Sequence, residues 1–140
     1  RLREGVVMID DSYNSSPTAL ARAFETVAAD HTPASRRVAV VGEMLELGGH
    51  ALGLHREAGR RAAAVGLRLL FAVGGAPARA LADAAIEAGM PASAVRYAEQ
   101  SELAADEVAG AIFPGDLVLV KGSRGTRTDI VADRIAAVFA

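Results

Sequence analysis

The chain has 140 residues, a length that fits one domain able to bury roughly two-thirds of the surface that its unfolded form exposes. Its 15 basic and 17 acidic residues give a net charge of -2 with no extended basic run, which argues against nucleic acid or an acidic membrane as a partner. The chain has no cysteine, and this excludes a disulfide framework, a thiolate nucleophile and a cysteine-based zinc site.

Short apolar runs alternate with segments of helical periodicity from the start of the chain. The first run, at 6–9, leads into Asp10 and Asp11, a pattern typical of a buried parallel strand whose carboxyl end carries polar residues. Ser16 followed by Pro17 then predicts an N-cap and the first turn of a helix that runs to about residue 30.

The same alternation continues to the end of the chain. Strands are predicted at 38–42, 69–73, 94–97 and 117–120, and helices after residue 49 up to Gly66, at 76–88, at 101–112 and at 129–139. With 31 alanines and 4% aromatic residues, the core is expected to pack Ala-rich helices closely on Val, Leu and Ile strands. The predicted fold class is therefore α/β: a single Rossmann-like domain with a doubly wound, mostly parallel sheet of about five to six strands.

The first candidate site is the polar loop after the first strand. In a sheet of this kind ligands bind at the carboxyl ends of the strands. Asp11, Tyr13 and Asn14 offer a carboxylate, a phenol and an amide that suit ribose hydroxyls or the edge of an adenine. Ser15 and Ser16 equally suit simple capping of the next helix, and both interpretations stay open for them.

The second candidate is the loop after the last strand. Lys121, Ser123 and Arg124 place two cations and a hydroxyl beside two glycines, Gly122 and Gly125, which is typical of an anion site to which the backbone comes close. It is not a phosphate loop of the Walker type, because no four-residue spacing between glycines followed by Lys-Ser or Lys-Thr occurs in the chain. A solvated basic loop is the alternative.

Two weaker signals lie after the second strand. Glu43 and Glu46 are compatible with three roles: orienting a basic loop, binding an amine or a metal, or starting a helix; spacing alone does not decide among them. His55 is a lone histidine near the start of a helix, without a second ligand at metal-binding spacing, so a structural role is predicted for it and no metal site is assigned.

Three blocks together resemble the C-terminal domain of the Mur ligase family. They are DDSYNSSP at 10–17, GEMLELG at 42–48 followed by HREAG at 55–59, and KGSR at 121–124. They keep the order of the family and span nearly the whole chain. Two of the blocks depart from the family pattern: Asn-Ser-Ser-Pro stands in place of Asn-Ala-Asn-Pro, and Glu43 in place of aspartate.

The resemblance implies that residues 1–140 are one domain of a three-domain parent. The N-terminal and central domains would hold the UDP-sugar, ATP and Mg²⁺, and the parent would join D-Ala-D-Ala to UDP-N-acetylmuramoyl-tripeptide through an acyl phosphate. Asp11, Tyr13 and Asn14 would face the ribose and adenine of ATP. Ser123 and Arg124 would bind the dipeptide, and Lys121 would act catalytically at the developing negative charge.

Two other functions are compatible with the fold class. A free-standing Rossmann-like nucleotide-binding module without ligase activity is the main alternative, whereas a dinucleotide-dependent oxidoreductase is disfavoured because no G-x-G-x-x-G follows the first strand. The chain shows neither a signal peptide nor an apolar run long enough to span a bilayer, so a cytoplasmic location is expected. Because it lacks a phosphate loop, the chain alone is expected to be inactive.

Overall fold

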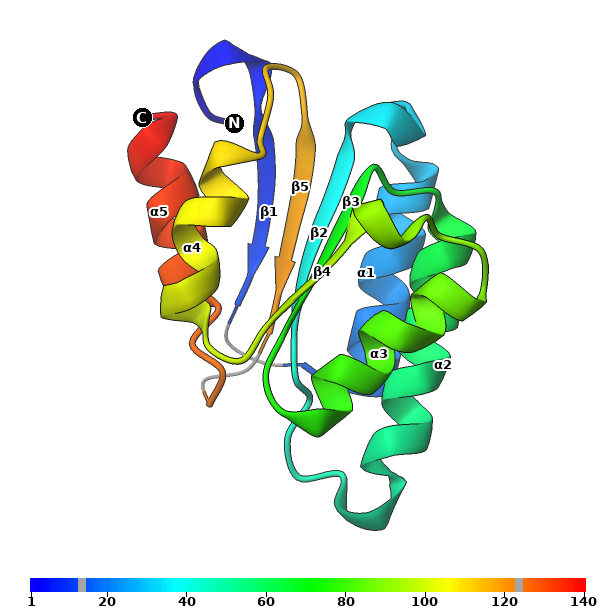
Figure 1. Cartoon of the computed structure of the whole chain (residues 1–140). Helices are drawn as coiled ribbons and strands as arrows, with labels where there is room; N and C mark the ends of the chain where they lie inside the picture. Colours follow the sequence, from blue (N-terminus) through cyan, green and yellow to red (C-terminus); the bar gives the residue numbers. More distant parts are fainter. Residues whose placement is uncertain (13–14, 123–124) are drawn as a thin grey trace.

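A computed structural model describes residues 1–12, 15–122 and 125–140, and its described part contains one five-stranded sheet with helices on both faces (Figure 1). The strands are β1 (Val7–Asp11), β2 (Arg37–Gly42), β3 (Leu69–Val73), β4 (Val95–Ala98) and β5 (Leu117–Lys121). They lie in the order β1-β5-β2-β3-β4, and every pairing is parallel. The predicted doubly wound α/β fold is confirmed.

Helices cover the two faces of the sheet unequally. Helices α1 (Pro17–Ala29), α2 (Ala51–Val65) and α3 (Ala76–Glu87) enclose one core, and α4 (Ser101–Gly110) and α5 (Asp129–Val138) enclose the other (Figure 1). Successive residues of β2 alternate between the two cores: Ala39 packs in the first and Val38 and Val40 in the second. A strand buried on both faces must be apolar at every position, which is why the central strands are continuous apolar runs.

Local sequence signals set several of the boundaries. Ser16 caps α1, since its Oγ accepts a hydrogen bond from the N–H of Ala19 at 3.1 Å, and Pro17 is the first helical residue. Gly66 ends α2 with φ at 78°, in the left-handed region that favours glycine. Of the two roles left open for Ser16, capping is the one that the structure shows.

Several boundaries differ from prediction by a residue or more, and contacts elsewhere in the fold account for two of them. Strand β1 continues through Asp10 and Asp11, beyond its apolar run, because both residues pair in register with β5. Helix α4 ends at Gly110 rather than at 112. The carboxylate of Asp116 accepts the N–H of Phe113 at 2.8 Å and also pairs with Arg68, so the chain turns toward β5 early.

Helices α2 and α3 approach most closely at Gly59. A Cβ atom added there would lie 2.2 Å from the backbone oxygen of Leu81 and 3.1 Å from the Cβ of Ala84. Gly53, two turns earlier on the same helix, has nothing within 4 Å of such an atom. The small residues of this chain therefore have a packing role at the α2–α3 contact.

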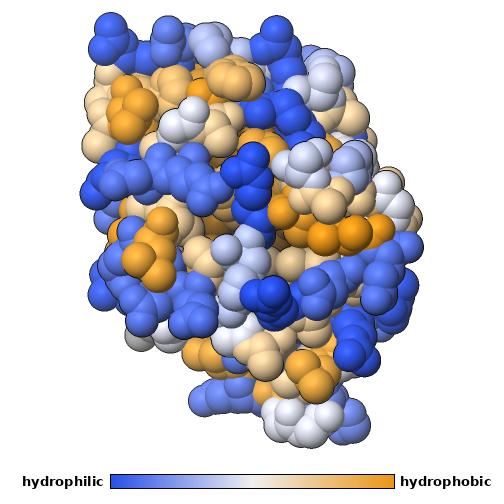
Figure 2. Space-filling model, viewed as in Figure 1, coloured by the Kyte–Doolittle hydropathy of each residue, from blue (hydrophilic) through white to orange (hydrophobic). Residues whose placement is uncertain are grey.

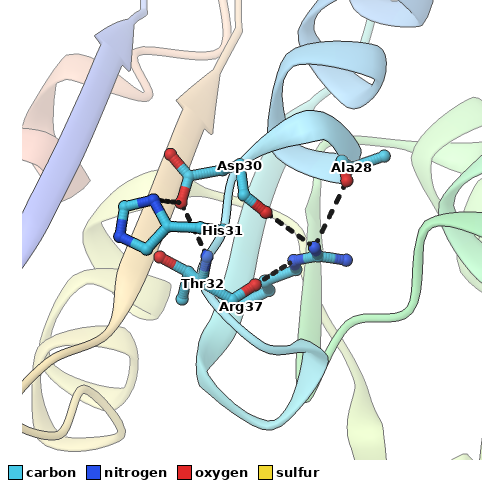
Figure 3. A network of polar contacts seen from close by, with 5 residues as sticks. All are labelled: Ala28, Asp30, His31, Thr32 and Arg37. Carbon is cyan, nitrogen blue, oxygen red and sulfur yellow. Dashed lines mark hydrogen bonds and ion pairs between the residues drawn. The ribbon is translucent and has the colours of Figure 1, made fainter.

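Arg37, the first residue of β2, donates hydrogen bonds to the ends of α1 and α2 and to the segment that connects α1 with β2. Its guanidinium donates to the backbone oxygens of Thr32 at 2.9 Å, Val65 at 2.9 Å and Ala28 at 3.3 Å. A fourth bond, of 3.2 Å, goes to the oxygen of Asp30. Figure 3 shows this group of contacts around the connection between α1 and β2, apart from the bond to Val65 at the end of α2. One cation thus satisfies carbonyl groups at the ends of two helices, where no backbone partner exists.

Arg37→Met should lower the free energy of unfolding by about 2 kcal/mol, because it removes charge-assisted hydrogen bonds and leaves helix-terminal carbonyls without that donor. Denaturant unfolding of the chain measures this effect. Arg60→Met is the matched control, since Arg60 is exposed on α2 and has no hydrogen bond within the described ranges; it should stay within about 0.5 kcal/mol. Equal unfolding midpoints for the two variants would show that the Arg37 contacts do not stabilise the fold.

Candidate functional site

The carboxyl ends of all five strands lie at one edge of the sheet, because all pairings are parallel. Neighbouring strands β1 and β5 continue to opposite faces there: β1 leads to α1 in the first core and β5 to α5 in the second. Such divergence is a topological switch point, where open α/β sheets bind ligands. The loops after β1 and β5, two of the three candidate loops predicted from the sequence, begin at this point.

Asp11 and Lys121 form an ion pair at this edge. They are directly paired in the β1–β5 register, and Nζ of Lys121 donates to Oδ2 of Asp11. The side chain of Lys121 is only 3% exposed, whereas that of Asp11 is 53% exposed. The backbones are joined as well, since the N–H of Gly122 donates to the Asp11 oxygen at 3.2 Å. A buried cation and a half-exposed carboxylate therefore occupy neighbouring positions 110 residues apart in sequence.

A buried threonine, which the sequence analysis did not single out, packs the loops of this edge together. The hydroxyl of Thr128 donates to the backbone oxygen of Ser12 at 3.3 Å, and Thr128 is fully buried. A Cβ atom at Gly122 would lie 1.9 Å from Thr128 Oγ1, and one at Gly42 would lie 2.8 Å from Thr128 Cγ2. Segments following β1, β2 and β5 thus meet at one side chain. The available signal in the sequence was a glycine at the end of β2, Gly42, and one directly after β5, Gly122.

The two glycines predicted to admit a ligand are close to protein atoms. Thr128 lies over Gly122, and a Cβ atom at Gly125 would lie 2.2 Å from Cδ1 of Leu45. At Gly122 the neighbour belongs to the same connection between β5 and α5, whereas at Gly125 it is the end of a flexible side chain from the loop after β2. The predicted role of both glycines in letting a ligand reach the backbone stays a prediction.

His55 has the structural role that was predicted for it. Its Nε2 accepts the N–H of Met44 at 2.9 Å, so Nδ1 carries the proton and donates to the oxygen of Ala51 at 2.6 Å. The ring is fully buried. A neutral imidazole thereby anchors the loop after β2 to the first turn of α2, and both ring nitrogens are occupied.

Glu43 borders a cleft of about 350 Å³ at the same edge. Its Oε1 accepts the N–H of Gly75 at 2.7 Å, which ties the loop after β2 to the loop after β3. On the other side, the hydroxyl of Ser101 donates to the backbone oxygen of Thr126 at 2.6 Å. The cleft is lined by Glu43, Leu45, Gly74, Gly75, Glu99, Gln100, Ser101, Glu102, Gly125, Thr126 and Arg127. Among the charged side chains of this lining, three carboxylates stand against one cation, Arg127, so the cleft suits a cationic or hydrogen-bond-donating group.

Neither Asp11 nor Lys121 lines this cleft or the groove along α3. A groove of about 720 Å³ runs along α3, between Leu52 and Arg56 of α2 and Tyr97 and Glu99 at the end of β4. The face seen in Figure 2 is mainly hydrophilic, with hydrophobic areas interspersed. Within the described ranges, no group of three histidine or acidic side chains is placed to hold a metal ion. The ion pair at the switch point is therefore the focus of the site.

Four of the six predicted site residues lie outside the described residues. Tyr13 and Asn14 follow Ser12, and Ser123 and Arg124 follow Gly122. Of the predicted set, the structure brings together Asp11 and Lys121, and the roles of the other four stay predictions.

Comparison with known proteins decides the family. The profile described as "Mur ligase, glutamate ligase domain" matches residues 1–124. The chain belongs to the Mur ligase family. As a Mur ligase C-terminal domain, it is 33% identical over 150 aligned residues to the UDP-N-acetylmuramoyl-tripeptide–D-alanyl-D-alanine ligase of Mycobacterium bovis, with 96% of this chain and 29% of that protein covered. The ligase of the same name from Bacillus subtilis is 31% identical, over 94% of this chain and 28% of the relative.

Solved Mur ligases show the same fold. The MurF ligase of Thermotoga maritima in complex with ADP superimposes with a TM-score of 0.78 and 27% identity, covering 99% of this chain and 30% of that one. MurF of Acinetobacter baumannii gives a TM-score of 0.78 at 25% identity, with coverage of 98% and 29%. The chain thus spans less than a third of the length of these relatives. Within its described part, no helix of this Mur ligase domain is long and apolar enough to cross a membrane.

Proposed function

We propose that this Mur ligase domain belongs to an ATP-dependent enzyme that joins D-Ala-D-Ala to UDP-N-acetylmuramoyl-tripeptide. The observation that carries the proposal is that relatives bearing this name align with nine-tenths or more of the chain. Residues 1–140 would form the C-terminal domain of a three-domain cytoplasmic parent, whose other two domains would be their partners. Those domains would hold the UDP-sugar and most of the ATP and Mg²⁺ contacts.

The geometry supports an active site to which this domain contributes some residues and the other domains of such an enzyme contribute the rest. In the proposed reaction, ATP converts the terminal carboxylate of the tripeptide into an acyl phosphate, and the dipeptide amine attacks its carbonyl carbon. Negative charge gathers on the carbonyl oxygen, and phosphate leaves with the bonding electrons as the peptide bond forms. The described residues supply a buried cation and a carboxylate for this chemistry, but no cluster that would hold Mg²⁺.

Lys121 is the residue that we assign to the reacting centre. A buried ammonium group held by strand pairing is already oriented, so it stabilises developing charge without reorganising in the transition state. Asp11 is assigned to the ribose of ATP, because its carboxylate is half exposed and Oδ1 accepts no hydrogen bond from the described residues. Tyr13 and Asn14 complete the proposed nucleotide contacts.

Arg124 and Ser123 are assigned to the dipeptide. A guanidinium grips a carboxylate through two parallel hydrogen bonds, and this matches the free carboxylate of D-Ala-D-Ala. Arg124→Ala in the complete ligase should therefore raise the Michaelis constant for the dipeptide by about 10- to 100-fold, corresponding to the loss of one charge-assisted contact. The constant for ATP should change less than threefold. Arg134→Ala is the control on α5, and an unchanged dipeptide constant in Arg124→Ala would rule out the assigned role.

An acceptor panel tests the proposed function as a whole. The description of the family profile names glutamate, whereas the names of the relatives specify D-Ala-D-Ala. The complete enzyme is therefore assayed with UDP-linked muramoyl peptides, ATP and one of two acceptors, D-glutamate or D-Ala-D-Ala. Formation of the dipeptide adduct, detected by mass spectrometry, is the expected result. Ligation of D-glutamate alone would make the acceptor assignment wrong. The isolated chain should release no phosphate from ATP. If the complete enzyme bound nucleotide but ligated neither acceptor, a nucleotide-binding module would be favoured instead.

A further inference from the structure

Lys121 is the only lysine of the chain, and its ammonium group is almost completely buried at the carboxyl end of β5. Burial of a charge is unfavourable unless an opposite charge and hydrogen bonds compensate for it. Among the described side chains, Asp11 is the one that accepts a hydrogen bond from this ammonium. Among the described side chains, the position of the Lys121 amine is therefore set by one carboxylate.

The carboxylate of Asp11 is positioned beside Lys121 by the pairing of β1 with β5, and not by a loop. Strand β5 lies between β1 and β2, and the direct neighbours of Lys121 are Asp11 on one side and Val41 on the other. The adjacent Asp10 is directly paired with Val120 and, because side chains alternate along a strand, points to the opposite face of the sheet. The chain thus provides two consecutive aspartates, of which one contacts the amine.

We infer that Asp11 is a positioning residue for Lys121, in addition to its proposed contact with the nucleotide. Oδ2 accepts a hydrogen bond from the ammonium and keeps it in place, while Oδ1 stays available to a hydroxyl of the ligand. The inference rests on the catalytic role proposed above for Lys121.

Amine acetylation of the isolated chain tests the positioning step without any ligand. Trace acetic anhydride modifies Lys121 and the terminal amine, and the latter serves as the internal standard in peptide mass spectrometry. Asp11→Asn should raise the relative rate at Lys121 by about tenfold, since loss of the carboxylate releases a buried amine that is otherwise held by a charge-assisted hydrogen bond. Asp10→Asn should stay within twofold. Equal rates in these two variants would overturn the inference.

Asp11→Glu keeps the charge and should return the rate toward that of the unaltered chain, and circular dichroism separates this effect from unfolding. A rate in Asp11→Glu as high as in Asp11→Asn, with the fold intact, would also overturn the inference. Because neither nucleotide nor dipeptide is present, these results are independent of the ligase assignment.

A double-mutant cycle in the complete ligase tests whether Asp11 acts through Lys121. If it does, turnover of Asp11→Asn/Lys121→Met should lie within threefold of Lys121→Met alone, since residues of one unit are not additive. Asp11→Asn should also lower turnover by itself. Two results would show that Asp11 is a nucleotide contact only. In the first, the turnover losses of the two single variants multiply in the double variant; in the second, Asp11→Asn changes only the Michaelis constant for ATP.

Discussion

Lys121→Met in the complete ligase should lower turnover by about 100- to 1,000-fold, the loss typical of removing one preorganised electrostatic contact to developing charge. Methionine keeps most of the length and apolar volume of the side chain, so the change is mainly the loss of the cation. Lys121 is 3% exposed, and water cannot easily take over its role. Steady-state kinetics with saturating ATP and dipeptide measure the effect.

The Michaelis constants separate this role from a binding role. Both constants should stay within about threefold, because an interaction made only in the transition state affects turnover and not ground-state binding. Lys121→Arg keeps the charge and should recover part of the activity, while Arg60→Met on the exposed side of α2 should be neutral. Full turnover in Lys121→Met would exclude the lysine from the chemistry.

Gly59→Ala should lower the free energy of unfolding by about 3 kcal/mol, at the upper end of the usual effect of overpacking. The added methyl group would lie 2.2 Å from the backbone oxygen of Leu81, and a backbone atom cannot move aside as a flexible side chain can. Helices α2 and α3 would have to separate. Thermal unfolding of the chain should show a decrease in Tm of about 10 °C.

Gly53→Ala is the matched control on the same helix. Nothing lies within 4 Å of a Cβ atom at Gly53, and alanine restricts the unfolded chain more than glycine does. This variant should therefore be more stable by about 0.5–1 kcal/mol. The diagnostic result is a lower free energy of unfolding in Gly59→Ala together with a higher one in Gly53→Ala. Equal stabilisation by both substitutions would mean that α2 and α3 tolerate a larger separation.

The sequence by itself determined the elements and their class. Strand β3 was predicted at its observed limits because a strand buried on both faces is apolar throughout, and the start of α1 was predicted because Ser16 and Pro17 act locally. The motifs after β1, β2 and β5 also identified the family from sequence alone. These signals are local or arise from residues a few positions apart, so no knowledge of the packing was needed.

Only the tertiary structure decided which elements are neighbours. Strands β2 and β5 are equally apolar, and hydropathy does not reveal that β5 inserts between β1 and β2. That insertion brings Asp11 to Lys121, and through the same loops it buries Thr128 against Gly42 and Gly122. The four carbonyl contacts of Arg37 likewise depend on how α1 and α2 end beside β2. A side chain's partner across 110 residues is set by strand order and register, which result from the packing of the whole domain and are not encoded near either residue.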